Sequence, residues 1–372
     1  MSNPLNLSIM NNPFTNITEA AAASVAETST VSGVVGKEDL SPIGYTIAAC
    51  VLCFIMVVGC VNNLIVIIVV GGTKKLRTPM NIILLNLSLS DFCISALGTP
   101  MSFASAINHQ WIFGDFLCQA YAFCMTLTGM TAIGTLAAIA IDRYIIISRT
   151  FCGQSMSGKS SFATITGIWV YSLIQATPPL FGWNRFIVEH PGIACSLDWQ
   201  SSDVSHVSFI IYIFFLGYFL PLVIISFCYI RVIWIIKTSP KPSGKSSTAK
   251  AEHKVTLMAS AMIACTFFAW TPYAVASLMV SAGYEHLLGP VSSVCPAIFA
   301  KTSVIYNPIV YFFFNSQIRE ALLAKLPATW TRKRESTVDI SLDTKRGLTI
   351  VNTVISNHVL GNGKEYIETQ KL

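Results

Sequence analysis

Long apolar runs separated by short polar segments occupy the chain from residue 43 to residue 314. Seven of these runs are long enough to cross a lipid bilayer as helices, because about 20 predominantly apolar residues span its hydrocarbon core. The runs cover residues 43–71, 80–107, 116–148, 161–182, 206–236, 253–281 and 289–314. The pattern therefore predicts an all-α membrane protein, a bundle of seven transmembrane helices.

Polar segments flank this predicted bundle. Residues 1–42 contain no spanning run, and residues 327–372 are rich in serine, threonine and charged side chains, a composition typical of disordered segments. Just after the last run, residues 315–325 carry apolar Ile318 beside basic Arg319. This pattern favours a short amphipathic helix on the membrane surface. We expect an N-terminal tail at 1–42, a membrane domain at 43–326 and a disordered tail at 327–372.

Composition and charge indicate that the bundle lies in a membrane and predict its orientation there. The chain is 53% hydrophobic and 11% charged, with a mean hydropathy of +0.61, which is too apolar for a soluble protein. Lysine and arginine concentrate after the first, third, fifth and seventh runs. Positive loops stay in the cytoplasm, so we expect a multi-pass plasma-membrane protein with its N-terminus outside and its C-terminus in the cytoplasm. The net charge of +6 then reflects topology and contact with membrane lipid, and does not indicate nucleic acid.

Two features fit an extracellular side. Asn6 and Asn16 begin Asn-Leu-Ser and Asn-Ile-Thr, which are N-glycosylation triplets. Most of the eleven cysteines lie inside apolar runs, but Cys118 starts the third run and Cys195 lies between the fourth and fifth. Both face the oxidising compartment, so we predict a disulfide between them, with two free thiols as the alternative.

The most unusual residue is Lys301, the one charged residue in the run from Pro290 to Phe314. Eleven residues of this run precede it and 13 follow it. A cation near the middle of the bilayer costs roughly 2.5–3.5 kcal/mol on insertion scales, and a neutral amine or a covalent imine avoids part of that cost. The alternative is a lysine that reaches to the membrane surface, but its position is deep on both sides. We therefore expect this amine to be neutral or to be bound covalently as an imine.

Other polar residues interrupt the runs. Asn63 and Asp91 lie in the first and second runs and are expected to face the bundle interior and bond to one another. Asp142-Arg143-Tyr144 ends the third run, and Glu252, at the inner end of the sixth, offers Arg143 a second carboxylate. This arrangement predicts an ion pair between helices.

Prolines predict two breaks in the last two runs. Pro272 follows an aromatic cluster that begins at Phe267, and the resulting bend could act as a hinge. These aromatic residues either line a cavity or fill the bundle core. Pro308, directly after Asn307, frees a backbone carbonyl that neighbouring side chains must satisfy.

These motifs together resemble the rhodopsin-like class of G-protein-coupled receptors, from about residue 45 to residue 325. The resemblance rests on Asp142-Arg143-Tyr144, the stretch from Phe267 to Tyr273, the stretch from Asn307 to Tyr311 and the Cys118/Cys195 pair. Within that class, Ala300-Lys301-Thr302-Ser303 resembles the opsins, whose seventh-helix lysine binds retinal as a Schiff base. Among opsins the chain resembles the ciliary type, in particular the encephalopsin and teleost multiple-tissue group.

The resemblance implies roles for individual residues. Lys301 would hold retinal, 11-cis before and all-trans after light, in a pocket that includes Tyr121, Gly129, Met130, Trp270, Tyr273 and Ala300. Coupling to a heterotrimeric G protein would involve Asp142, Arg143, Tyr144, Tyr229, Glu252, Asn307, Pro308 and Tyr311, with Asn63 and Asp91 in an inner polar network. An arrestin and a receptor kinase would act on the hydroxyl-rich tail. No metal is implied.

One departure concerns the anion beside the lysine. Vertebrate visual pigments keep a third-helix glutamate where, aligned on Cys118, this chain has Tyr121. A protonated imine in the membrane needs an anion. Glu189 lies six residues before Cys195 and resembles the second-loop glutamate of opsins that lack the third-helix acid. The resemblance therefore implies Glu189 as the counterion.

We predict a light-sensing receptor, not an enzyme, that activates a G protein of the Gi, Go or transducin-like class and is bistable. One alternative is a retinal photoisomerase without a signalling partner, against which the intact cytoplasmic motifs argue. Another is a receptor for a diffusible ligand, which gives no reason for Lys301. The tripeptide Asn315-Ser316-Gln317 differs from the Asn-Lys-Gln of many opsins, so the G-protein class stays open.

Overall fold

The computed structural model describes residues 39–148, 157–238, 247–325, 342–343 and 347–348. The predicted glycan acceptors Asn6 and Asn16 and most of the C-terminal tail lie outside these ranges. The backbone at Glu252 is described, but its side chain is not, so its predicted ion pair with Arg143 stays a prediction.

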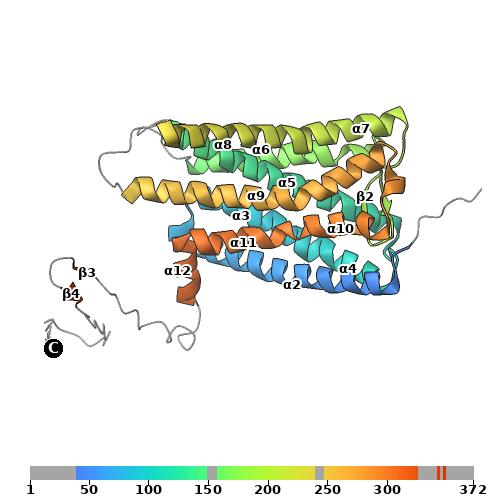
Figure 1. Cartoon of the computed structure of the whole chain (residues 1–372), viewed down its shortest axis with the longest axis horizontal. Coiled ribbons are helices and arrows are strands. Elements are labelled where there is room, and N and C mark those ends of the chain that lie inside the picture. Colours follow the sequence, from blue (N-terminus) through green and yellow to red (C-terminus); the bar gives the residue numbers. More distant parts are fainter. Residues whose placement is uncertain (1–38, 149–156, 239–246, 326–341, 344–346, 349–372) are drawn as a thin grey trace, which may run out of the picture. The chain divides into compact units, whose positions relative to one another are not determined.

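Within the described residues, seven helical segments lie side by side and form a bundle (Figure 1). The first four are α2 (Pro42–Gly72); α3 (Pro79–Cys93), the π-helical turn η3 (Ile94–Gly98) and α4 (Thr99–Ile107); α5 (Gly114–Ser148); and α6 (Gly158–Ala176). The last three are α7 (Val204–Phe214), the π-helical turn η5 (Phe215–Phe219) and α8 (Leu220–Thr238); α9 (Ser247–Ser281); and α10 (Pro290–Lys301) with α11 (Ser303–Phe314). Short 3-10 turns are η2 (Lys74–Leu76), η4 (Pro178–Phe181) and η6 (Glu285–Leu287).

The fourth segment departs most from the predicted runs. Among the described residues, six helices are long and apolar enough to cross a membrane, and α6, with 19 residues, is not one of them. It begins at Gly158, capped by the side chain of Ser157. It ends at Ala176 because Pro178 and Pro179 follow, and proline cannot continue the helical hydrogen bonding.

The break at Pro308 is compensated as expected. A proline leaves the carbonyl four residues before it without a helical partner, and here that residue is Val304. The amide of Asn63 donates to the Val304 oxygen at 2.8 Å and to the Gly59 oxygen at 2.9 Å. One buried side chain on α2 therefore satisfies the freed carbonyl on α11.

A β-hairpin that the sequence analysis did not predict lies between α6 and α7. Strands β1 (Phe186–Glu189) and β2 (Ala194–Leu197) pair antiparallel, with Val188 opposite Cys195 and Glu189 opposite Ala194. The predicted disulfide between Cys118 and Cys195 is confirmed, and it joins β2 to the first turns of α5. The hairpin is therefore fixed across one end of the bundle, which we call the hairpin end.

The chain divides into two units, residues 1–319 and 320–372. Helix α12 (Ser316–Lys325) begins in the first unit, where Ile318 is buried, and confirms a short helix after the seventh segment. In the second unit, β3 (Leu342–Asp343) pairs antiparallel with β4 (Gly347–Leu348). The proposed disorder of residues 327–372 stays a prediction.

Candidate functional site

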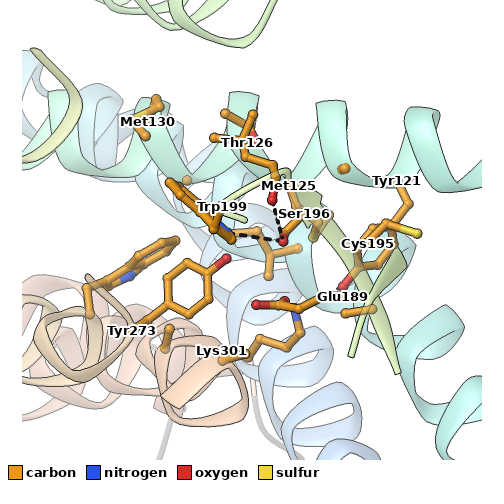
Figure 2. Close-up of a pocket in the computed structure, with 18 of the residues that line it drawn as sticks. Tyr121, Met125, Thr126, Met130, Glu189, Cys195, Ser196, Trp199, Tyr273 and Lys301 are labelled. Carbon is orange, nitrogen blue, oxygen red and sulfur yellow. Dashed lines mark hydrogen bonds between the residues drawn. The ribbon is translucent and has the colours of Figure 1, made fainter. Parts of the chain in front are cut away.

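A cavity lies inside the hairpin end of the bundle (Figure 2). Its walls come from α5, α9, α10 and the β1–β2 hairpin, and the space between protein atoms is about 880 Å³, part of it open to solvent. Among the described lining residues, Lys301 and Glu189 carry charge and most of the others are apolar or aromatic.

Lys301 is the last residue of α10, one position before the helix is interrupted at Thr302. It is half-buried, and its Nζ donates a hydrogen bond to the Tyr121 Oη at 3.0 Å. The Nζ also lies 5.6 Å from the centre of the Tyr121 ring, within the range of a cation–π contact. The amine therefore faces the cavity, where an aldehyde could reach it.

Tyr121 is held on its other side as well. Its hydroxyl lies 2.8 Å from the Oγ of Ser102 on α4, and the ring of Trp111 packs edge-on at 5.3 Å. Both Tyr121 and Ser102 are buried, with exposed fractions of 3% and 0%. These contacts fix the phenol beside Lys301.

Glu189 comes to the same cavity from β1. Its side chain points toward Lys301 in Figure 2. Together with Lys301 it also lines a second, smaller cavity beneath the hairpin. The placement depends on strand pairing: Glu189 lies opposite Ala194, next to the disulfide-bonded Cys195. Acid and amine thus share one largely apolar space, although they are 112 residues apart in sequence.

All six residues that the sequence analysis assigned to the retinal pocket line this cavity, namely Tyr121, Gly129, Met130, Trp270, Tyr273 and Ala300. Gly129 has a steric reason: a Cβ there would lie 3.1 Å from the Trp270 ring, so glycine lets the indole approach. The indole Nε1 donates to the Ser303 Oγ at 3.2 Å. Their roles toward retinal stay predictions.

The sequence analysis missed the lining residues of the hairpin and its flanks, chiefly Ser196 and Trp199. Trp199 donates to the Ser196 Oγ at 3.2 Å and packs edge-on against Tyr273 at 6.3 Å. One sequence signal could have found Ser196. It directly follows Cys195, whose predicted disulfide to Cys118 places it near the start of α5.

At the other end of the bundle, Arg143 forms a buried ion pair with the adjacent Asp142. Both residues line a third cavity together with Lys254 and Met258 of α9. Tyr144 packs edge-on against Phe227 at 5.8 Å, and Tyr229 is half-buried on α8. Four of the residues expected to couple to a G protein, Asp142, Arg143, Tyr144 and Tyr229, thus lie at the end opposite Lys301.

Between the two ends, Asp91 and Asn307 form a buried contact that the sequence analysis did not predict. The Asn307 amide donates to the Asp91 Oδ2 at 2.8 Å, and both side chains are at most 2% exposed. Asn63 reaches the same region through Val304, and Tyr311 is fully buried one turn beyond Asn307. The polar residues of three helical segments, α2, α3 and α11, therefore meet in the interior. Asn63 and Asp91 share no hydrogen bond with each other among the described contacts.

Known proteins resemble this chain in sequence and in fold. Residues 62–311 match the family described as 7 transmembrane receptor (rhodopsin family). Melanopsin of Phodopus sungorus is 34% identical over 300 residues, 78% of this chain and 64% of the relative. Melanopsin-B of Xenopus laevis is 35% identical over 314 residues, 82% and 59% of the two chains. The crystal structure of squid rhodopsin superposes with a TM-score of 0.74 at 30% identity, covering 79% of this chain and 89% of that one. The chain spans about three fifths of the length of these melanopsins.

Proposed function

Because this chain belongs to the rhodopsin family of seven-transmembrane receptors, we propose that it is a light-sensing receptor that holds retinal on Lys301 and activates a heterotrimeric G protein. Members of this family are receptors, not enzymes. The observation that carries the proposal is the amine of Lys301, which opens into an apolar cavity beside the acid of Glu189. The melanopsins and squid rhodopsin among its relatives favour light as the stimulus.

The residues present fit retinal in three respects. Lys301 supplies a primary amine that can condense with an aldehyde as water leaves. The remaining wall, with Met130, Ile213 and Trp270, suits a long apolar polyene. Glu189 offers an anion to a cation formed at the lysine nitrogen. Retinal, when bound through a protonated imine, supplies absorption in the visible range and a double bond that light isomerises.

The effect of light must then travel to the other end of the bundle. Trp270 and Tyr273 line the retinal cavity on either side of Pro272, and the same helix, α9, contributes Lys254 and Met258 to the cavity at Arg143. A change of retinal shape therefore presses on residues beside a proline bend, where a helix yields most easily. We expect the inner part of α9 to swing outward and to open the Arg143 cavity to a G protein.

Several finer statements belong to the proposal. The G protein is of the Gi, Go or transducin-like class, retinal is 11-cis before light and all-trans after it, and the photoproduct stays bound so that a second wavelength reverts it. The chain lies in the plasma membrane with Asn6 and Asn16 glycosylated outside. A receptor kinase phosphorylates hydroxyls of the cytoplasmic tail and an arrestin binds them, since clustered phosphate attracts basic surfaces.

The subgroup also stays a proposal. The resemblance stated from the sequence is to the ciliary encephalopsin and teleost multiple-tissue group, whereas the relatives found are melanopsins. The G-protein class that responds to light tests the ciliary assignment. A fall in cyclic AMP supports the Gi-type coupling proposed with it, and a light-driven calcium rise without a change in cyclic AMP contradicts that coupling.

The function as a whole is tested by an absorption spectrum and a light response in the same cells. Wild-type protein incubated with 11-cis-retinal should show a visible band that illumination changes, and cyclic AMP should fall in the light. Lys301→Ala should lose both, because no other amine lines the cavity among the described residues. Lys159→Ala, an exposed lysine at the start of α6, is the matched control and should keep both.

Two outcomes point elsewhere. An undiminished visible band in Lys301→Ala would place retinal elsewhere than on this lysine, and a wild-type protein that forms no pigment would reopen a diffusible ligand. A pigment that photoconverts while no second messenger responds would support a photoisomerase instead of a receptor.

A further inference from the structure

A buried chain of three polar groups begins at Lys301. The Lys301 Nζ donates to the Tyr121 Oη at 3.0 Å, and the same oxygen lies 2.8 Å from the Ser102 Oγ. The three residues come from α10, α5 and α4, so three helical segments meet at this point. Ser102 has an exposed fraction of 0%, and bulk water does not compete for its hydroxyl.

The donor strengths of the two hydroxyls favour one direction for this chain. A tyrosine hydroxyl has one hydrogen to donate and two lone pairs to accept. Since the amine of Lys301 donates to Tyr121, the phenol hydrogen is free for another acceptor, and Ser102 is the one described at hydrogen-bond distance. By distance alone either hydroxyl could be the donor, but a phenol, with a pKa of about 10, is a stronger acid than an aliphatic alcohol and therefore the stronger donor. The favoured arrangement therefore runs from Lys301 to Tyr121 to Ser102.

We infer that Ser102 is a positioning residue of the retinal site. It accepts the Tyr121 hydrogen and so keeps the phenol oxygen turned toward the Lys301 nitrogen as an acceptor. This inference rests on the proposed function, in which Lys301 carries retinal through an imine. A protonated imine has one N–H to donate, and a fixed acceptor favours that form. A neutral imine nitrogen accepts a hydrogen bond instead. Tyr121 can donate that hydrogen bond only if it breaks its hydrogen bond to Ser102.

At this site one residue acts through its charge and another through hydrogen bonding. The titratable groups that face Lys301 are Tyr121 from α5, Tyr273 from α9, and Glu189 and His190 from the hairpin. Glu189 acts by its charge, whereas Ser102 is neutral and touches Tyr121. Its influence on the nitrogen must therefore pass through the phenol. Removing Ser102 should matter only while Tyr121 has a hydroxyl.

The test is a pH titration of the visible band in purified pigment reconstituted with 11-cis-retinal. Ser102→Ala should move the midpoint of the visible-to-ultraviolet transition about half a pH unit to one pH unit lower, the size expected for the loss of one neutral hydrogen bond. Tyr121→Phe should lower it at least as much. In the double variant the two shifts should not add, because Ser102 acts through Tyr121. Ser102→Thr, which keeps the hydroxyl, should restore the wild-type midpoint.

Ser105 provides a matched control. It is a second fully buried serine on α4, one turn from Ser102, and its hydroxyl makes no described hydrogen bond. Ser105→Ala should leave the midpoint unchanged. If Ser102→Ala yields no folded protein, Ser102→Cys takes its place, since a thiol of similar size is a weaker acceptor and should lower the midpoint by a smaller amount.

The outcomes separate this inference from the function on which it rests. If the wild-type protein forms a pigment, and Ser102→Ala or Ser102→Cys has the same midpoint as wild type, only the role of Ser102 is overturned. Shifts that add fully in the double variant also overturn it, because they place Ser102 on a path independent of Tyr121. A wild-type protein that forms no pigment overturns the proposed function, and this inference with it.

Discussion

At the scale of single residues, position in the membrane indicates a functional role more clearly than residue type does. Lys301 was identified from sequence because a lone cation in an apolar run is costly, and that argument needs no tertiary structure. Its partners were harder to predict. The hydrogen bond to Tyr121 joins residues 180 positions apart, and the link onward to Ser102 joins two different helices. No local pattern records such pairs, so Ser102 was missed entirely.

Glu189 is the residue whose proposed role is most easily tested. Glu189→Gln keeps the size of the side chain and removes its charge. Because a nearby anion favours a cationic imine, the visible band should convert to an ultraviolet band at a lower pH than in wild type, and much of it should be lost at neutral pH. The measurement is an absorption titration after reconstitution with 11-cis-retinal.

Glu285→Gln is the control for this substitution, since Glu285 lies in η6 and does not line the cavity that contains Lys301. It should titrate as wild type does. A Glu189→Gln pigment that also titrates as wild type would place the anion elsewhere in the bundle. The illuminated wild-type pigment bears on the same proposal: prompt release of retinal would contradict a photoproduct that stays bound.

At the scale of elements, apolar runs predicted the helices well and the hairpin not at all. Six of the seven segments lie close to the predicted ranges because length and hydrophobicity are local properties. Strands β1 and β2 have four residues each, and their pairing depends on a disulfide to α5 and on contacts of Asp198. Those constraints join distant residues. The element that brings Glu189 to the site was therefore the least predictable from sequence.

Asp198 holds the base of this hairpin. Its buried carboxylate accepts hydrogen bonds from the Arg185 Nε at 2.9 Å and the Ser201 Oγ at 2.7 Å, and from the backbone of Gln200 and Ser201. Burial acts to raise the pKa of Asp198, but these hydrogen bonds outweigh it and hold the pKa below its usual value. The charged form therefore stabilises the hairpin.

A pH dependence follows from this depressed pKa. The stabilisation is fully present above the ordinary aspartate pKa of about 3.9 and is lost as the pH falls through the lower folded value. Asp198→Asn should be less stable than wild type at neutral pH by about 1–3 kcal/mol, because the donors around this position lose a charged acceptor. It should also lose less further stability on acidification than wild type.

Thermal inactivation of the detergent-purified protein, measured from pH 7 to pH 3, checks this expectation. Asp115→Asn serves as the control, because Asp115 is an exposed acid at the start of α5 and should change neither the stability nor its pH dependence. Equal acid sensitivity in wild type and Asp198→Asn would show that other groups set the loss of stability.

At the scale of the whole molecule, two cavities lie at opposite ends of one bundle, and α9 lines both. The interior between them is polar, through Asp91, Asn307 and Asn63. The sequence motifs predicted the functional residues at both ends, Lys301 at one and Arg143 at the other, because each motif is a short contiguous stretch. They could not predict the cavities themselves, which arise from how the helices pack. The family membership of the chain agrees with this arrangement.

The central claim is that the nitrogen of Lys301 is the attachment point of retinal. The most direct measurement is to incubate the purified wild-type protein with 11-cis-retinal in the dark, reduce it with borohydride to convert an imine into a stable amine, digest it and locate the added mass by mass spectrometry. The account predicts one retinyl group, on the peptide that contains Lys301. Retinyl on a different lysine, or no covalent adduct in a sample that shows the visible band, would contradict it.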